Sequence, residues 1–344
     1  MTLLRILLRE LLDFPITLRR ILLAVLICRL SGREIALKSR RFRKLRASDL
    51  VAFVPFYGND AILPAFLDHH RTLGVDLFVW LDLSTEGGLA ARLADANDCM
   101  VWRPRGRTPK LKRSVLWLNH LRRRFGTGRW CLSLDPSEFV VFNHSETRTL
   151  KDLAEFAEGE RRDHLFAIVI EMYAERPASE MSLAPGQHPL ELLSLFDPLG
   201  YETPERGRFY NIVVRGGPQR RKLFQAIPRR APALSRIPLV KWRWFFSYAA
   251  GTRLMLPRKL NQPHAIKHAN PTLCLLSFAQ LDSDEVLARA AAAEAGELAP
   301  GGGDLIYPGT VRLRRLALKI AFSQPYADSA DLVDTGLLNP GQWF

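Results

Sequence analysis

The chain has 344 residues, of which 47% are hydrophobic and 24% are charged. These values exclude a disordered chain, a collagen and a small disulfide-bonded scaffold. The net charge of +14 predicts an anionic partner, such as a nucleic acid, a phosphate or an acidic membrane surface.

The first 50 residues carry much of this charge, with 12 lysine and arginine residues against four acidic ones. Residues 3–14 place apolar side chains on one side at helical spacing, which predicts a basic amphipathic helix. The apolar run 21–28 is too short to span a membrane, which takes about 20 residues. We therefore expect residues 1–47 to lie on an anionic membrane surface, although a helix packed on the protein's own core has the same apolar stripe. A polybasic cluster supports this expectation and consists of Lys38, Arg40, Arg41, Arg43, Lys44 and Arg46.

From Leu50 onwards, apolar runs that are typical of strands alternate with segments of helical periodicity. This alternation predicts an α/β fold with a mostly parallel central sheet flanked by helices. The expected strands are 50–56, 76–82, 98–102, 129–134, 138–142 and 165–173. The expected helices are 61–73, 114–125, 150–158 and, late in the chain, 285–295.

After Pro177 the chain becomes rich in proline, glycine and arginine, and its periodicity weakens. We therefore expect three parts. They are the basic amphipathic segment 1–47, the α/β core 48–176, and an irregular C-terminal region 177–344 that packs on the core.

Three polar loops follow predicted strands, at the carboxyl ends where an open α/β sheet binds its ligand. They read Tyr57-Gly58-Asn59-Asp60, Asp82-Leu83-Ser84-Thr85-Glu86-Gly87-Gly88 and Asp135-Pro136-Ser137-Glu138. The chain has no P-loop motif, and no G-x-G-x-x-G follows a strand, which argues against a dinucleotide enzyme. Its four cysteines are far apart, so neither a zinc ribbon nor a redox motif is available.

Two longer motifs accompany these loops: Leu-Pro-x-Phe-Leu-x-His-His-Arg-x-Leu-Gly-Val at 63–75 and Trp-x-Leu-x-Leu-Asp-x-x-Glu-Phe at 130–139. Over about residues 50–340 the chain resembles a bacterial branch of the family 2 glycosyltransferases. The resemblance implies a GT-A-like fold and transfer of a sugar from a nucleoside-diphosphate sugar to a glycan or polysaccharide acceptor. It further implies a role in bacterial surface polysaccharide assembly, at the inner face of the cytoplasmic membrane.

The chain departs from the family's usual motifs, which are Arg-Asn-Glu, Asp-Asn-Gly-Ser-x-Asp-Gly and Asp-Ala-Asp-Glu. Gly58 replaces the arginine, Leu83 replaces an asparagine, and Ser137 stands in place of the second carboxylate of Asp-x-Asp. These departures support an alternative, a non-catalytic relative that acts as a binding or scaffold partner. A nucleic-acid-binding protein is suggested only by charge, and no motif of that class occurs, so we expect no nucleic acid partner.

The resemblance implies that the carboxylate of Asp82 hydrogen-bonds the nucleotide base of the donor. Tyr57 and Asn59 line the same pocket, and Asp60 and Ser84 follow the same strand ends. We expect these side chains to meet Asp135 at one edge of the sheet, because all of them follow strand ends. The basic loop after the third strand supplies candidates that would bind the diphosphate directly, as guanidinium groups do. They are Arg103, Arg105, Arg107, Lys110 and Lys112, and we select Arg105 and Lys110 among them.

The divalent cation of this family, Mg²⁺ or Mn²⁺, is held by the Asp-x-Asp pair. Asp135, Ser137 and Glu138 are the expected ligands here, and the lost carboxylate predicts a weakened or absent site. Glu171 lies within an apolar predicted strand, where an acid is costly unless it is partnered or functional. We expect it to be the general base, with a structural pairing to an arginine as the alternative.

Overall fold

The computed structural model describes residues 18–19, 21–39, 42–106, 113–184, 186–202, 205–206, 212–261, 270–283, 286–288 and 309–343. The expected amphipathic helix 3–14, Arg40, Arg41, Lys110 and most of the expected helix 285–295 lie outside these residues.

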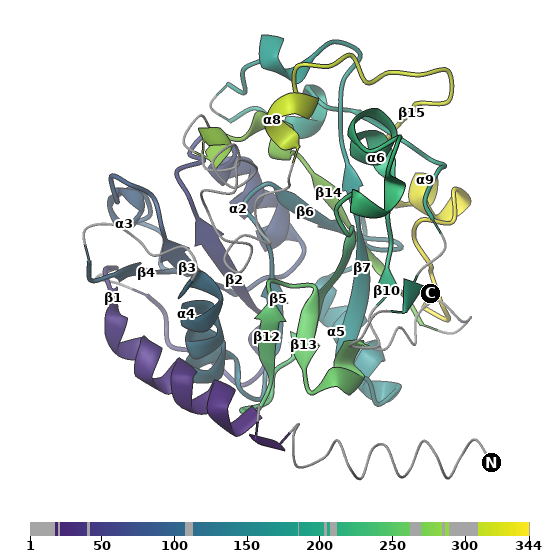
Figure 1. Ribbon diagram of the computed structural model, residues 1–344. Coiled ribbons are helices and arrows are strands. Elements are labelled where there is room, and N and C mark those ends of the chain that lie inside the picture. The colour runs from purple at the N-terminus through teal and green to yellow at the C-terminus, as the bar shows by residue number, and fades with distance from the viewer. Residues whose placement is uncertain are drawn as a thin grey trace, which may run out of the picture.

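A sheet of nine strands forms the centre of the molecule, in the order β1-β4-β3-β2-β5-β11-β7-β14-β6 (Figure 1). Strands β4, β3, β2 and β5 are parallel neighbours, and β7 and β14 run in the same direction beyond the antiparallel β11. Six of the nine strands therefore share one direction, which confirms the expected α/β class with a mostly parallel sheet. The strands are β1 (Ile35–Leu37), β2 (Val51–Phe56), β3 (Leu77–Asp82), β4 (Cys99–Pro104), β5 (Trp130–Ser133), β6 (Glu138–Val141), β7 (His164–Glu171), β11 (Ser235–Lys241) and β14 (Leu273–Ser277).

Both faces of the sheet are covered, which is why β2 is apolar at every position. In β2, Val54 and Phe56 pack with α2, α3 and α5, whereas Val51 and Phe53 face the opposite way and pack with α4 and the hairpin of β12 and β13. Side chains of a strand alternate between its two faces, so a strand that is buried on both sides consists mainly of apolar residues. These elements are α2 (Leu63–Thr72), α3 (Leu89–Arg92), α4 (Ser114–Leu121), α5 (Leu150–Gly159), β12 (Ser247–Ala250) and β13 (Leu254–Leu256).

The remaining described elements are short, and α6, α9 and β15 among them lie on the right in Figure 1. The helices are α6 (Gly217–Leu223), α8 (Thr310–Leu313), α9 (Ser329–Asp334) and the π-helical η3 (Arg122–Gly126). The 3-10 turns are η1 (Gly32–Glu34), η4 (Ala178–Glu180), η5 (Pro189–Glu191), η6 (Pro228–Arg230), η7 (Arg258–Asn261) and η9 (Ala279–Leu281). The small strands are β8 (Leu195–Phe196), β9 (Glu205–Arg206), β10 (Ile212–Val213) and β15 (Gln324–Pro325).

Three strands of the central sheet were not predicted from the sequence: the short β1, β11 and β14. Proline and arginine interrupt the apolar run of β11, and β14 is a run of only five residues shortly after Pro271. Both strands come from the region 177–344, so the central sheet continues across the expected boundary at residue 176.

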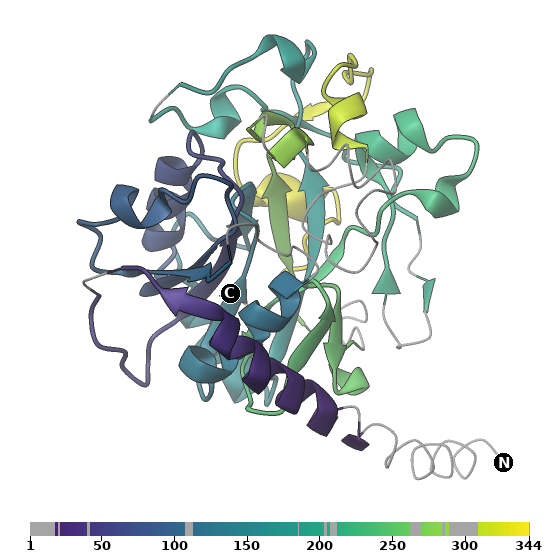
Figure 2. The ribbon, with the colours of Figure 1, turned by 60° about the vertical axis from the view of Figure 1, so that its left-hand side comes forward.

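A helix formed by residues 18–19 and 21–31 lies along α4, below the sheet in Figure 2. The carbonyl oxygen of Cys28 lies 3.1 Å from Nδ1 of His120 in α4. Gly32 directly follows this helix. A Cβ atom at this position would lie 2.1 Å from the His120 ring, so glycine allows the chain to pass close to α4. No helix in the described ranges has the length and apolar character needed to cross a bilayer.

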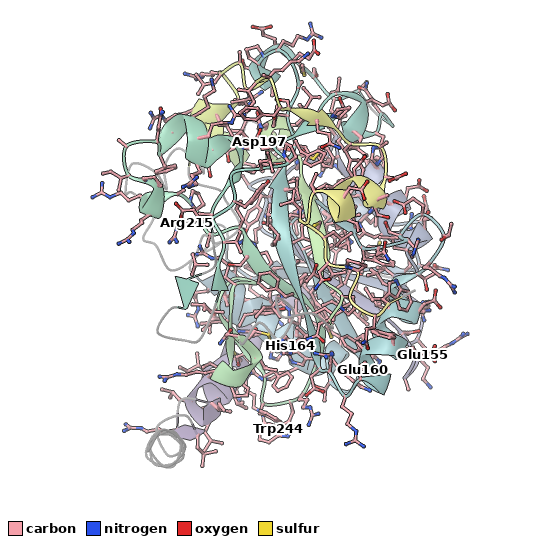
Figure 3. All side chains as sticks on the ribbon, turned by 90° about the vertical axis from the view of Figure 1, so that its right-hand side faces the viewer. Glu155, Glu160, His164, Asp197, Arg215 and Trp244 are labelled. Carbon is pink, nitrogen blue, oxygen red and sulfur yellow. The ribbon has the colours of Figure 1, made fainter. Side chains whose placement is uncertain are left out.

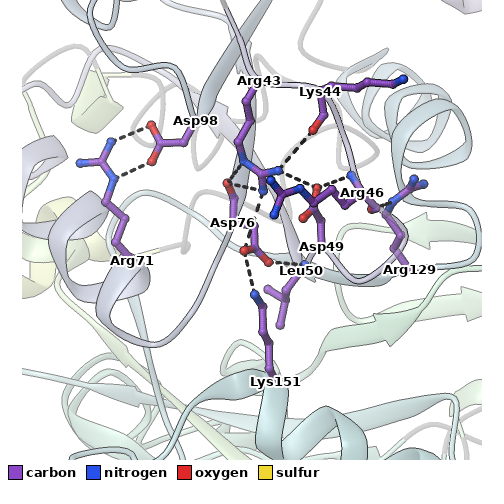
Figure 4. A network of polar contacts seen from close by, with 10 residues as sticks. All are labelled: Arg43, Lys44, Arg46, Asp49, Leu50, Arg71, Asp76, Asp98, Arg129 and Lys151. Atoms are coloured by element: carbon purple, nitrogen blue, oxygen red, sulfur yellow. Dashed lines mark hydrogen bonds and ion pairs between the residues drawn. The ribbon is translucent and has the colours of Figure 1, made fainter.

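The segment after β1 is held to the core by ion pairs and hydrogen bonds (Figure 4). The Arg43 guanidinium donates to the carbonyl oxygen of Asp76 and pairs with the Asp49 carboxylate at 2.9 Å. Lys151 pairs with the Asp76 carboxylate at 2.7 Å. Part of the predicted polybasic cluster therefore has a structural role, because Arg43 is used within the fold.

Candidate functional site

The loops after β2, β3 and β5 lie at one edge of the sheet. These strands are parallel neighbours in the order β3-β2-β5, and each ends at its predicted polar residues. The expectation that Tyr57, Asp82 and Asp135 share one edge is therefore confirmed. Strand β6 runs in the opposite direction, so its first residue, Glu138, lies at the same edge.

Three buried side chains and the half-buried Asp282 form an acidic cluster at this edge: Asp135, Ser137, Glu138 and Asp282. The Ser137 hydroxyl hydrogen-bonds to the Asp282 carboxylate. The Glu138 carboxylate accepts from the backbone N–H of Asp135 at 3.0 Å. The acidic cluster thus joins the loop after β5 to the loop after η9, although the two loops are far apart in the sequence.

Two side chains from other strands complete the surroundings of the acidic cluster. The Asn59 amide, from the loop after β2, donates to Oδ1 of Asp282 at 2.6 Å. Nε of Arg236, a buried residue of β11, lies 3.8 Å from Oε1 of Glu138. Asn59 therefore lies with the predicted cation ligands and contacts the acidic cluster.

Burial favours the protonated form of two carboxyl groups in the acidic cluster. Burial raises the pKa of Asp282 to about 8. Burial, followed by the neighbouring Glu138 carboxylate, raises the pKa of Asp135 well above its ordinary value. Oδ1 of Asp135 is buried and accepts no hydrogen bond from the described residues. An unsatisfied buried carboxylate oxygen calls for a donor or a cation.

The chemistry of the acidic cluster fits a hard divalent cation, which prefers carboxylate and hydroxyl oxygens. Within the described ranges, however, no three histidine, cysteine, aspartate or glutamate side chains are already grouped as metal ligands. The oxygen atoms of the acidic cluster are thus of the right chemical kind, but its side chains would have to change conformation to bind an ion together.

Asp82 lies on the other side of β2 from the acidic cluster and has its own partners. One carboxylate oxygen accepts from the backbone N–H of Ser84 at 3.0 Å and from its hydroxyl. The other oxygen pairs with Arg103 of β4 at 3.2 Å. The Arg103 guanidinium also packs on Gly87, where a Cβ atom would lie 2.4 Å from it. A nucleotide base could therefore hydrogen-bond to this oxygen of Asp82 only if Arg103 moved away.

Two further predicted residues are not in contact with the acidic cluster in the interactions described. The Asp60 side chain is 45% exposed and pairs with Arg92 of α3 at 2.9 Å. Arg105 is an exposed residue just after β4, at the far side of β3 from the acidic cluster, and its backbone N–H donates to the carbonyl oxygen of Glu34. Lys110 lies outside the described residues.

Glu171 ends β7, two strands away from Glu138. It is in register with Ser277 of β14, which is in register with Glu138, so the three residues share one face of the sheet. Its Oε2 atom accepts from the backbone N–H of Gln219 at 3.2 Å, near the start of α6. Burial raises the pKa of Glu171 to about 8, and the nearby Asp197 carboxylate adds to this.

We expect Glu171→Gln to change how stability depends on pH. The Glu171 pKa is raised from an ordinary value of 4.5 to about 8, so the folded state retains a proton that the unfolded state releases between these values. The wild type should therefore lose stability as pH rises from 5 to 8, by on the order of a few kcal/mol from this group. Glutamine keeps the acceptor for Gln219 and does not titrate, so the variant should lose less. Urea denaturation of both proteins at pH 5 and pH 8 measures the difference.

The exposed Glu180→Gln change is the control for removing one charge, and its pH dependence should follow the wild type. Equal pH dependence in Glu171→Gln and wild type would contradict the assigned environment of Glu171.

The sequence analysis missed two residues of this site, Asp282 and Arg236. Asp282 follows η9, just beyond the end of β14. Polar residues after strand ends are candidates for ligand binding, so recognition of β14 would have identified Asp282 as one. Arg236 is a single charged residue within an apolar run, and a buried charge of this kind is often paired with an opposite charge.

No protein-family model matches this chain, and no curated protein matches it. Among solved structures, a crystal structure of 4-diphosphocytidyl-2C-methyl-D-erythritol synthase is similar over 42% of this chain and 68% of that chain. The sequence identity is 18% and the TM-score is 0.24, and a similarity at this level carries no conclusion about function.

Proposed function

We propose that this protein is a glycosyltransferase that moves a sugar from a nucleoside-diphosphate sugar to a glycan or polysaccharide acceptor. The observation that carries the proposal is the acidic cluster with its unsatisfied Asp135 oxygen at the carboxyl edge of the sheet. In open α/β sheets this edge binds the ligand. The loop motifs that resemble family 2 glycosyltransferases end in the same residues.

Asp135, Ser137 and Asp282 are the residues that would hold a Mg²⁺ or Mn²⁺ ion, with Glu138 beside them. Such an ion neutralises the negative charge that develops on a diphosphate leaving group. Asn59 and Ser137 orient the Asp282 carboxylate through their hydrogen bonds.

Glu171 is the proposed general base for the acceptor hydroxyl. Its pKa of about 8 lies close to neutral pH, where a general base works well. It shares a face of the sheet with Glu138 two strands away, so an acceptor would approach from the side of β7 and α6. We further propose that the reaction serves bacterial surface polysaccharide assembly at the inner face of the cytoplasmic membrane.

A second candidate, a non-catalytic protein that binds or scaffolds, is favoured by the contacts of Asp82. Arg103 and Ser84 use both oxygens of this carboxylate, which the family resemblance assigns to the nucleotide base. The missing second carboxylate at Ser137 also favours it.

A binding screen of the full chain against nucleoside-diphosphate sugars, with and without Mn²⁺, separates the two candidates. We expect one donor to bind with micromolar affinity in the presence of Mn²⁺ and more weakly after chelation. Chelator-resistant binding that is lost in Arg105→Ala or Lys110→Ala would instead assign the diphosphate to the basic loop. If neither the wild type nor Ser137→Asp binds any donor, the catalytic proposal fails and the non-catalytic one stands.

A further inference from the structure

The exposed apolar side chains of this protein are concentrated at its N-terminal end. Of the thirteen large apolar side chains that are strongly exposed in the described ranges, eight lie between residues 18 and 42. Six of these form one face of the N-terminal helix, with exposed fractions of 37–55%. We call them the outer helix face: Leu18, Leu22, Leu23, Leu26, Ile27 and Leu30.

This helix is apolar on both sides, unlike an ordinary surface helix, which is polar towards water. Its inner side is buried against the protein through Ile21, Val25 and Cys28. The helix lies along α4 (Figure 2). The side chains of the outer helix face are exposed to solvent. A contiguous exposed apolar surface of this kind marks a site of interaction with a protein or a membrane.

The exposed charges around the outer helix face are positive, which favours an anionic partner. Residues 14–33 contain no aspartate or glutamate. Arg19, Arg29 and Arg33 are exposed along the helix and just after it. Exposed basic residues continue beyond β1, at Lys38 and Lys44. Basic residues beside an apolar helix face are typical of a helix that lies in the interface of an anionic bilayer.

An exposed tryptophan lies on the same side of the molecule. Trp244 is 56% exposed, and the Arg123 guanidinium donates to its carbonyl oxygen at 2.9 Å. Arg123 in turn lies beside Cys28 of the N-terminal helix. Figure 3 shows Trp244 at the lower end of the molecule, the end where the N-terminal helix lies. Tryptophan favours the boundary between lipid and water, so this residue suits the same surface.

We infer that the outer helix face, with Trp244 beside it, docks this protein onto an anionic lipid surface without spanning it. This inference sharpens the membrane part of the proposed function by naming the residues that enter the lipid, and it stands whether or not the protein transfers a sugar. A second copy of the chain is a poorer occupant, because a symmetric contact would bring Arg19 and Arg29 of both copies together.

The test measures binding of the full chain to two kinds of vesicle, phosphatidylcholine alone and phosphatidylcholine mixed with phosphatidylglycerol. We expect binding to the anionic vesicles only, and weaker binding as salt is raised. The double variant Leu22→Glu with Leu26→Glu should bind at least about 100-fold more weakly, since two leucines no longer leave water. Arg29→Ser should weaken binding by about fivefold.

The matched control carries the same change at exposed apolar residues elsewhere, Leu199→Glu with Phe322→Glu, which are 66% and 62% exposed. It should bind the anionic vesicles as the wild type does. All the changes are at exposed positions, so circular dichroism and thermal unfolding should match the wild type.

Equal binding to both kinds of vesicle, or full binding by the Leu22→Glu and Leu26→Glu variant, would overturn the inference. A dimer that the same variant dissociates, with no vesicle binding by the wild type, would assign the outer helix face to a second copy. Deletion of residues 1–46 is a less direct test, because it also removes β1 and the Arg43 anchor. Donor binding is measured separately, so failure of this inference leaves the glycosyltransferase proposal intact.

Discussion

Asp135→Asn is expected to lower the affinity for Mn²⁺ by at least about 100-fold. A carboxylate that binds the ion directly contributes more than a group that only contacts one of the ligands, and loss of the latter already costs about 10–100-fold. The Asp135 carboxylate is buried, and one of its oxygens accepts no hydrogen bond from the described residues. Asparagine has nearly the same size, so the loop after β5 should keep its structure. Isothermal titration of Mn²⁺ in the presence of the bound donor measures the effect.

Ser137→Asp is the complementary change. It restores the second carboxylate of the Asp-x-Asp pair beside Asp282, and it should raise Mn²⁺ affinity by about tenfold or more, because the number and charge of the ligands determine affinity for hard cations. Asp95→Asn is the control, since Asp95 is an exposed residue after α3. Mn²⁺ binding that is the same in the wild type, Asp135→Asn and Ser137→Asp would exclude the acidic cluster as the cation site.

Phe139→Ala is expected to lower the free energy of unfolding by about 3–5 kcal/mol, the usual cost of removing a fully buried phenylalanine ring. Phe139 is 1% exposed and lies where α2, β6 and η9 meet. Its ring centre is 5.1 Å from those of His69 and Phe278 and 6.0 Å from that of Phe66. Urea denaturation followed by tryptophan fluorescence measures the change.

Phe322→Ala is the matched control, because Phe322 is 62% exposed and should contribute less than about 1 kcal/mol. A loss below about 1 kcal/mol in Phe139→Ala would mean that this aromatic packing is not as tight as described. Cation binding should also weaken in Phe139→Ala, since Phe139 follows Glu138 directly and Phe278 donates its N–H to the carbonyl oxygen of Ser137.

Part of the site was predictable because local patterns report strand ends. Apolar runs followed by polar loops identified the ends of β2, β3 and β5 and placed Tyr57, Asp82 and Asp135 together at one edge. What the loop residues bind was not predictable from these patterns. Asn59 contacts Asp282 and Asp60 pairs with Arg92, although the two residues are adjacent in the sequence.

The sequence by itself determined the α/β class, the first half of the sheet and the basic apolar character of the N-terminal segment. Each of these depends on periodicity and composition, which are local properties of the chain. Only the tertiary structure shows that β11 and β14 belong to the central sheet. These strands bring Arg236 and Asp282 to the acidic cluster. The tertiary structure also decided which face of the N-terminal helix is buried on α4 and which is exposed. The physical reason is that pairing of distant strands and burial of one helix face depend on partners far away in the chain, which no local pattern specifies.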